Sequence, residues 1–266
     1  MAEKLMLAKT VEEALQLKDG KAAYLAGGTE VNRLGSSVDA ETLVSIRKIR
    51  KLSGIRKEAD KVWIGAATTF QEVIDHPDTP CYIKEACRLM ASRTKRNMAT
   101  LGGNIFLCRD DSYLLPTLLA AHADIVYCTV SGKNEEACVC EYLEAREKGE
   151  LADALILRIG LDPDRKIQLK RYANTAMSHS MLNIAYGCDA DGKNVSIGAA
   201  VKNTGVFRLS CLENMIESDP SVPEERIEET VRTCEGLDLA DDMYGSKEYK
   251  RYLLGVTVAK MAANAR

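Results

Sequence analysis

The chain has 266 residues, of which 46% are hydrophobic, and this is enough to form the core of one large domain or two smaller ones. Its net charge of −3 and its pI of about 5.8 argue against a nucleic-acid partner, because phosphate binding usually requires a basic surface. No apolar segment approaches the roughly 20 residues that cross a bilayer, and the N-terminal residues lack the apolar core of a signal peptide. We therefore expect a cytoplasmic protein with no membrane partner.

The first part of the chain alternates between helical and strand patterns, as α/β proteins do. Thr68 and Gln71 have the spacing of a capping box at the start of one expected helix. The expected helices cover residues 11–18, 68–75, 82–90, 112–123 and 140–148, and the expected strands cover residues 22–26, 42–46, 62–66, 124–130 and 154–161.

The order of the elements changes after Asp162-Pro163-Asp164, where strands are followed by helices. This order is typical of a separate α+β module, and we place the boundary near Asp164. The chain would then consist of residues 1–164 and residues 165–266. In the second part, strands are expected over residues 167–172, 181–188 and 194–202, and helices over residues 207–217, 224–234 and 247–263.

Two glycine pairs, Gly27-Gly28 and Gly102-Gly103, are the main candidates for a binding site. A Gly-Gly turn at the end of a strand exposes backbone N–H groups without a side chain in the way, and such groups bind anions. Thr29 and Thr100 would add hydroxyl groups. The alternative interpretation is an ordinary turn, and neither a dinucleotide-binding G-x-G-x-x-G nor a P-loop is present. The residues by themselves therefore indicate a candidate phosphate binder and no specific cofactor.

Three segments carry a resemblance to a known family. The segment YLAGGTEV (residues 24–31), the segment RNMATLGGNI (residues 96–105) and the helical segment LLPTLLAAHA (residues 114–123) resemble the FAD-binding subunits of molybdenum hydroxylases, of the xanthine dehydrogenase and carbon monoxide dehydrogenase type. The second segment is the most specific. Lys170 falls where the family carries a lysine near the flavin. The resemblance extends in order over nearly the whole chain.

The resemblance implies an α+β protein that binds FAD. We expect this FAD to be non-covalent, because no motif points to a nucleophilic histidine or cysteine at the flavin ring. A two-subdomain FAD-binding domain of the PCMH type, split near residues 55–60, would occupy residues 1–164. A C-terminal flavoprotein domain with a small antiparallel sheet and helices would occupy residues 165–266. The implied cofactor-binding residues are Leu25, Ala26, Gly27, Gly28, Thr29, Glu30, Val31, Asn32, Thr100, Leu101, Gly102, Gly103, Asn104, Ile105, Asp110, Tyr113, Ile156 and Lys170.

One position departs from the family pattern. Tyr113 stands where the family often has an aspartate that reaches the flavin side of the cofactor. Two interpretations follow. Either Asp110 or Asp111 takes the place of that aspartate, or the Tyr113 ring stacks on or covers the flavin.

The charged residues near the two segments have alternative interpretations. Glu30 would bond a ribose hydroxyl or a backbone amide, or it is a solvated loop carboxylate. Arg93, Lys95 and Arg96 would offset the charge of a pyrophosphate, or they cap the preceding helix, whose C-terminal end carries a negative partial charge.

The cysteines and histidines indicate no metal site. The nine cysteines are irregularly spaced, and in a reducing compartment most are expected to be free thiols. Cys128, Cys138 and Cys140 fall in the region where some relatives carry an iron–sulfur cluster, but a cluster usually needs four cysteine ligands. The three histidines share no metal-ligand spacing. We interpret His122 as a cation that complements a helix end.

The resemblance also implies a function. A molybdopterin-containing large subunit would hydroxylate the substrate, and a small 2Fe–2S subunit would relay electrons to the FAD of this chain and on to NAD or another acceptor. The chain would be an oxidoreductase subunit that is incomplete on its own, and we find no catalytic residues in it. Two alternatives remain: a self-sufficient flavin oxidoreductase, and an assembly or scaffold protein that keeps the fold without the flavin.

Overall fold

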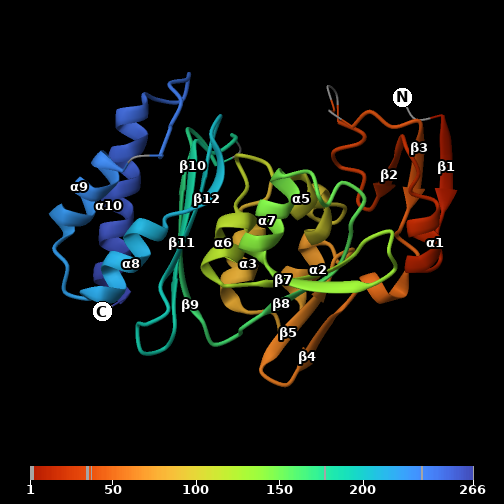
Figure 1. Ribbon diagram of the computed structural model, residues 1–266, viewed down its shortest axis with the longest axis horizontal. Helices are drawn as coiled ribbons and strands as arrows, with labels where there is room; N and C mark the ends of the chain where they lie inside the picture. The colour runs from red at the N-terminus through yellow and green to blue at the C-terminus, as the bar shows by residue number, and fades with distance from the viewer. Residues whose placement is uncertain (1–2, 34–35, 37, 177, 235, 266) are drawn as a thin grey trace. The chain divides into compact units, whose positions relative to one another are not determined.

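A computed structural model describes residues 3–265 except 34, 35, 37, 177 and 235. The chain forms two compact units that are interleaved in sequence (Figure 1). The first unit comprises Met1–Pro80, Met90–Leu107 and Ala123–Pro163, and the second comprises Cys81–Leu89, Cys108–His122 and Asp164–Arg266. Two segments that the sequence places in the N-terminal part, Cys81–Leu89 and Cys108–His122, thus belong to the second unit.

A three-stranded parallel sheet begins the first unit. Its strand order is β1-β3-β2, with β1 (Lys4–Leu7), β2 (Ala22–Leu25) and β3 (Thr42–Ser45). Helix α1 (Val11–Gln16) starts after Thr10, whose side chain accepts a hydrogen bond from the N–H of Glu13. The helix buries Val11, Ala14 and Leu15 in a core that includes Val44 of the central strand.

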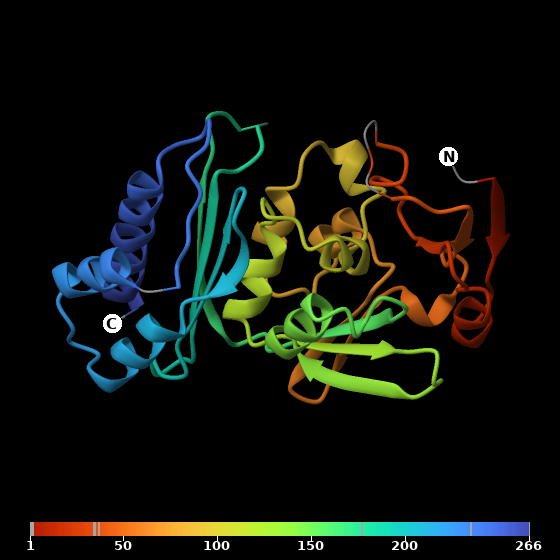
Figure 2. The same cartoon turned by 45° about the horizontal axis from the view of Figure 1, so that its top comes forward.

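A five-stranded antiparallel sheet forms the rest of the first unit's framework. Its order is β4-β5-β8-β6-β7, and the β6–β7 hairpin lies at one edge (yellow-green in Figure 2). A short 3₁₀ helix, η1 (Arg50–Leu52), precedes it. The strands are β4 (Ile55–Glu58), β5 (Lys61–Gly65), β6 (Asp124–Cys128), β7 (Asn134–Cys138) and β8 (Leu155–Leu161).

The helices of the first unit are α2 (Phe70–Asp75), α4 (Arg93–Arg96), α5 (Leu101–Leu107) and α7 (Val139–Glu147). The predicted capping box at α2 is displaced by one residue, since Thr69 and Glu72 form it. The reason is that the Thr68 hydroxyl is buried and bonds the backbone of Gly54. Gln71 is likewise occupied, because its amide donates to Asp75.

The second unit is built on a four-stranded antiparallel sheet with helices on both faces. The strand order is β12-β11-β10-β9, and every residue of β10 and β11 is buried. Figure 1 shows α3 and α6 on one face and α8, α9 and α10 on the other. The strands are β9 (Lys166–Tyr172), β10 (Leu182–Cys188), β11 (Ser196–Val201) and β12 (Gly205–Arg208), and the helices are α3 (Cys81–Arg88), α6 (Leu114–Ala120), α8 (Ser210–Ser218), α9 (Glu224–Thr233) and α10 (Lys247–Ala265).

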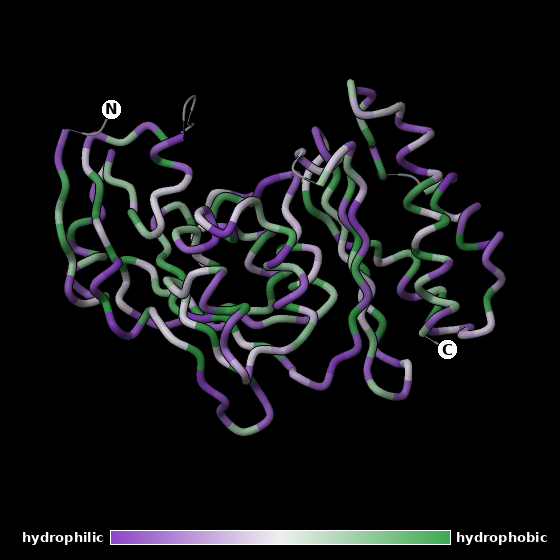
Figure 3. The backbone as a smooth tube through the Cα atoms, turned by 180° about the vertical axis from the view of Figure 1, so that it is seen from behind, coloured by the Kyte–Doolittle hydropathy of each residue, from purple (hydrophilic) through white to green (hydrophobic). Residues whose placement is uncertain are grey.

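Helix α6 approaches the sheet closely because two glycines face it. A Cβ on Gly187 would lie 2.1 Å from the carbonyl oxygen of Ala120, and one on Gly198 would lie 2.5 Å from that of Pro116. The opposite face packs apolar residues of the sheet against α8, α9 and α10, and these helices carry alternating polar and apolar bands (Figure 3). The predicted α+β class with a small antiparallel sheet is confirmed. In the described part of the chain, no helix has both the length and the apolar character to cross a membrane.

Candidate functional site

The first glycine segment directly follows β2 and leaves backbone donors unused. Gly28 has a φ of +71°, a conformation that favours glycine. The segment closes on itself through a 3.1 Å bond from the N–H of Asn32 to the carbonyl oxygen of Gly28. Within the described residues, no acceptor takes the N–H groups of Gly27, Gly28 or Thr29. Three successive donors of this kind can hold an anionic oxygen, so the segment fits the pyrophosphate of a dinucleotide.

Gly27 brings this segment against the chain that leads to the second one. A Cβ on Gly27 would lie 1.9 Å from the carbonyl oxygen of Met98 and 3.2 Å from the Cα of Ala99. Because no real side chain tolerates such a distance, only glycine permits this approach. The two segments that carry the family resemblance are therefore neighbours within the first unit.

The second glycine pair is not a turn at the end of a strand, so that prediction is wrong. Gly102 and Gly103 lie in the first turn of α5. The N–H of Leu101 donates to Thr68, that of Gly102 to Ala66 and that of Gly103 to the Thr100 hydroxyl, at 3.1, 2.8 and 3.3 Å. A Cβ on Gly102 would lie 2.7 Å from the Cβ of Ala66. These glycines serve packing, and their amides are already occupied.

Two arginines hold the backbone on either side of the second glycine pair. Arg146 of α7 donates to the carbonyl oxygens of Phe106 and Leu107, in the last turn of α5, at 2.9 and 3.4 Å. Arg96 donates to the carbonyl oxygens of Met90 and Ala91 at 3.1 and 3.0 Å and to the side chain of Gln71. Arg96 therefore holds the loop after α3, whereas the helix cap predicted for it would involve carbonyls of α3 itself, which ends at Arg88. No sequence pattern pointed to Arg146.

The remaining candidates of the first unit have their own partners. The carboxylate of Glu30 is largely buried and pairs with Arg33 at 2.6 Å. Ile156 is buried in β8 opposite Tyr127 of β6. Its predicted approach to the flavin stays a prediction.

In the second unit, both aspartates before α6 are engaged. Asp110 accepts from Lys202 at 2.7 Å and from the N–H of Asn203 at 2.9 Å. Asp111 is buried, and it contacts Arg109 at 2.9 Å and the Nδ1 of His179 at 2.5 Å. Burial raises the pKa of Asp111, but the bond and charge of Arg109 and the charge of His179 outweigh it, so the pKa is lowered. This carboxylate is ionised at neutral pH.

Tyr113 and Lys170 each form a cation–π contact in this unit. The guanidinium of Arg171 lies 5.5 Å from the Tyr113 ring centroid, and the Nζ of Lys170 lies 5.7 Å from that of Tyr172. Lys170 is exposed on β9, whereas Tyr113 is half-buried at the start of α6. The buried amide of Asn183 donates to the carbonyl oxygens of Asp111 and Ser112, each at 3.1 Å, and so fixes the segment that carries these side chains. Asn183 was not among the predicted residues.

The predicted cationic role of His122 is wrong. His122 follows α6 in a left-handed conformation, with φ +48°. Burial and the nearby charges of Arg165 and Arg208 lower its pKa, so the imidazole is neutral at pH 7. His122 ends the helix by its backbone conformation.

The cysteines largely follow the prediction, with one correction. Cys138 and Cys140 form a disulfide, while the other seven cysteines are not disulfide-bonded. Cys138 also caps α7, since its sulfur accepts from the N–H of Glu141. No group of three or more metal-binding side chains occurs among the described residues.

Comparison with known proteins gives a consistent result. The sequence model of the family described as "FAD binding domain in molybdopterin dehydrogenase" matches residues 2–161. The uncharacterized protein YgfM of Escherichia coli (strain K12) is 28% identical over 271 residues, covering 100% of this chain and 97% of YgfM. The nicotinate dehydrogenase FAD-subunit of Eubacterium barkeri is 34% identical over 108 residues, covering 36% of each chain. The structure of carbon monoxide dehydrogenase from Hydrogenophaga pseudoflava matches with a TM-score of 0.82 at 19% identity, covering 100% of this chain and 97% of that chain, so the fold is shared.

Proposed function

Because the chain belongs to the family of FAD-binding domains of molybdopterin dehydrogenases, we propose that it is the electron-transferring flavin subunit of a multi-subunit molybdenum hydroxylase. FAD is the cofactor, and the chain is a component of an oxidoreductase. The observation that carries the proposal is the set of unused N–H groups at Gly27, Gly28 and Thr29, which lies inside the segment matched by the family.

In this proposal the first unit holds the pyrophosphate. The N–H groups of Gly27, Gly28 and Thr29 would bind its oxygens, while Arg146 holds α5 through its bond to the carbonyl oxygen of Phe106. The further residues that we propose to contact FAD are Leu25, Ala26, Glu30, Val31, Asn32, Thr100, Leu101, Gly102, Gly103, Asn104, Ile105, Asp110, Tyr113, Ile156 and Lys170. For Leu101, Gly102 and Gly103 the contact would be steric, since their amides are occupied.

Bound FAD supplies redox chemistry that can proceed by one or two electrons. The residues of this chain bind and orient it, and no acid–base step is assigned to them. The partners would be a molybdopterin-containing large subunit and a small 2Fe–2S subunit, and NAD is the acceptor that we propose. Support comes from relatives that are themselves named as parts of larger enzymes, an FAD-subunit and a medium chain. We retain residues 1–164 and 165–266 as the functional division of the chain, and a cytoplasmic location.

The test of FAD binding uses a matched pair of variants at Gly28. Asparagine and aspartate have the same shape and both tolerate a positive φ, but only aspartate adds a negative charge beside the bound pyrophosphate. A Cβ here would lie 3.2 Å from Asn32 and 3.4 Å from Leu25, so both variants should fold. We expect Gly28→Asp to bind FAD at least about tenfold more weakly than Gly28→Asn, a difference of about 1.4 kcal/mol, measured by flavin fluorescence.

Three outcomes separate the alternatives. Flavin absorption bands in the wild-type protein, weakened by Gly28→Asp only, would support the proposal. A folded wild-type protein that is colourless and does not take up FAD would refute it and favour the flavin-free scaffold. For the acceptor, anaerobic NADH should bleach the bound flavin, and failure to do so would refute NAD while leaving FAD binding intact.

A further inference from the structure

Two cysteines that are distant in sequence meet in the second unit. Cys211 lies in the first turn of α8, and Cys234 directly follows α9. Their sulfur atoms are 3.5 Å apart, although 23 positions separate them in the chain. A disulfide requires a sulfur–sulfur distance of about 2.05 Å, so the sulfurs need to approach by only about 1.5 Å. Changes of side-chain torsion can supply a movement of this size.

The pair is open to small reagents from the surface. Cys211 is exposed and Cys234 is partly buried. Burial and the hydrogen bond with Cys234 raise the pKa of Cys211 to about 11, so little of it is thiolate at neutral pH. Since the thiolate is the reactive form, exchange should become faster as the pH rises toward that value.

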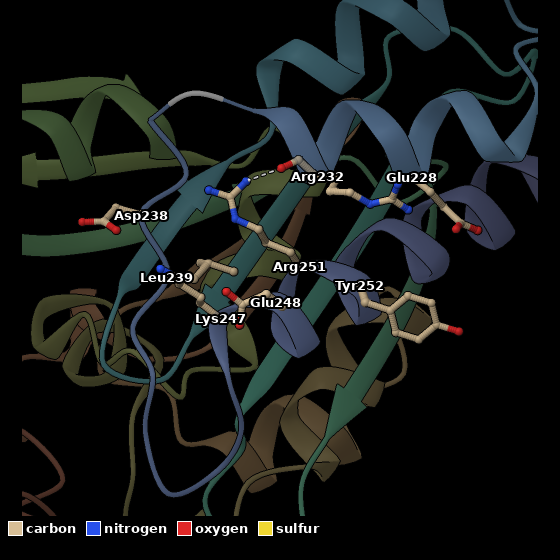
Figure 4. A pocket seen from close by; sticks show the side chains of 8 residues that line it. All are labelled: Glu228, Arg232, Asp238, Leu239, Lys247, Glu248, Arg251 and Tyr252. Carbon is tan, nitrogen blue, oxygen red and sulfur yellow. Dashed lines mark hydrogen bonds between the residues drawn. The ribbon is translucent and has the colours of Figure 1, made fainter.

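The backbone that carries Cys234 is held by an arginine of α10. Arg251 donates to the carbonyl oxygens of Val231, Arg232 and Cys234 at 3.0, 3.1 and 3.3 Å. Figure 4 shows its guanidinium reaching the backbone of Arg232, beside a surface pocket lined by residues of α9, of α10 and of the segment between them. This arginine therefore fixes the backbone at the end of α9, where the sulfur of Cys234 lies 3.5 Å from that of Cys211.

We propose that Cys211 and Cys234 are a reversible redox site, at which a low-molecular-weight disulfide oxidises the two thiols to an intramolecular disulfide. One protein thiolate attacks a sulfur of glutathione disulfide, which forms a mixed disulfide and releases one glutathione. The other protein thiolate then attacks the mixed disulfide, which forms the Cys211–Cys234 bond and releases the second glutathione. Two protein thiols are oxidised and one glutathione disulfide is reduced to two thiols.

The bond would tie the start of α8 to the end of α9. It would close a loop that contains both helices, and closing a loop stabilises the folded state by restricting the unfolded chain. It would also fix the residues that border the pocket of Figure 4 at the end of α9, such as Arg232. The consequence is a second unit whose stability depends on the redox state of the surroundings.

The test uses the full chain, reduced and then exposed to glutathione disulfide at pH 8.5. After alkylation under denaturing conditions, trypsin should release residues 209–226 joined to residues 233–247, because cleavage follows Arg208, Arg226, Arg232 and Lys247. The linked peptide should disappear after treatment with dithiothreitol. Cys81→Ser, which removes another exposed thiol, is the matched control and should leave the linked peptide unchanged.

Melting temperatures provide the second measurement. Oxidation should raise the melting temperature of the wild-type protein and of Cys81→Ser by several degrees, about 4 °C or less for each kcal/mol in a chain of this size. In Cys211→Ser and Cys234→Ser oxidation can restore only the Cys138–Cys140 disulfide, so the rise should be smaller than in the wild-type protein and in Cys81→Ser. The proposal is overturned if Cys211 and Cys234 are recovered separately alkylated, as two mixed disulfides with glutathione, or joined to other cysteines.

Discussion

The carbonyl oxygen of Met98 occupies the space where a side chain on Gly27 would begin, 1.9 Å from the position of a Cβ. This contact joins the loop after β2 to the segment that leads into α5. The positions of the two glycine pairs in the fold therefore depend on each other, because the close approach is possible only without a side chain at Gly27.

Replacing Gly27 with alanine should disturb both folding and cofactor binding. The added methyl group forces the two segments apart, and overpacking of this kind costs about 1–3 kcal/mol. We expect urea unfolding to show that loss, together with a loss of FAD affinity. Gly132→Ala is a useful control, because that glycine has a positive φ in the β6–β7 loop with open space around it. An FAD affinity that falls equally in both variants would contradict the specific role of the Gly27–Met98 contact.

Removing Arg146, which bonds the last turn of α5, should weaken FAD binding. Arg146→Ala deletes two hydrogen bonds to carbonyls at the end of the helix, and each such bond from a charged group contributes about 1.5–3 kcal/mol. We expect a lower melting temperature and a weaker FAD affinity in fluorescence titrations. Lys148→Ala, at the residue that directly follows α7, should change neither the melting temperature nor the FAD affinity. Unchanged affinity in Arg146→Ala would show that α5 is held by its packing alone.

The fully buried Lys250 should be the most sensitive charged residue of the second unit. Its ammonium group donates to Asp242 and to the carbonyl oxygen of Ala240, both at 2.7 Å. Lys250→Met leaves the carboxylate without its cation, and breaking a buried pair costs about 3–5 kcal/mol. Urea unfolding should show this loss, whereas Lys247→Met at an exposed position of the same helix should cost less than about 0.5 kcal/mol. Equal effects in the two variants would disprove the role of the pair.

His122 should make the protein less stable in mild acid. Its pKa is lowered in the folded state from the ordinary value of 6.5, so the unfolded chain takes up the proton first. Its contribution to stability is complete above pH 6.5 and declines as the pH falls from there through the folded pKa, by about 1.4 kcal/mol for each unit of pKa difference. His122→Asn keeps a residue that tolerates the positive φ and removes the titration. Between pH 7.5 and 5.5 its free energy of unfolding should fall less than that of the wild type, and parallel curves would contradict this assignment.

The single tryptophan offers a spectroscopic probe of the first unit. The Arg158 guanidinium lies 3.9 Å from the Trp63 ring centroid, and a Cβ on Gly160 would lie 2.8 Å from the indole. Arg158→Ala should therefore shift the fluorescence emission to longer wavelength and cost about 0.5–1 kcal/mol. Gly160→Ala should also shift the emission, because it displaces the ring. Lys57→Ala, on the neighbouring strand β4, is the control, and an emission shift of similar size there would mean that the spectrum does not report the stacking.

The central strands could be predicted from sequence, but the edge strands could not. β10 and β11 are apolar and buried on both faces, and β8 is buried over most of its length. β4 and β7 are short and mostly exposed, with the sequences IRKE and NEEAC. They are strands because the neighbouring hairpin strands β5 and β6 pair with them, whereas their own residues carry little strand propensity.

Helix α5 shows why local signals failed at the candidate site. Two adjacent glycines disfavour a helix, yet the bonds from Leu101 and Gly102 to the 66–68 segment and the contact with Ala66 impose one. The family resemblance identified the correct segments. It could not identify the partners of Asp110 and Asp111, because Lys202 and His179 lie in turns and loops far along the chain.

The interleaving of the two units limits how this protein can be divided. The chain passes from one unit to the other after Pro80, Leu89, Leu107, His122 and Pro163. A fragment that begins at Asp164 would lack α6, and with it the helix that covers one face of its sheet and the backbone to which Gly187 and Gly198 are fitted. No single proteolytic cut can therefore release either unit intact. A recombination or gene fusion that exchanges only residues 164–266 of this chain would therefore separate the second unit's sheet from the helix that covers it.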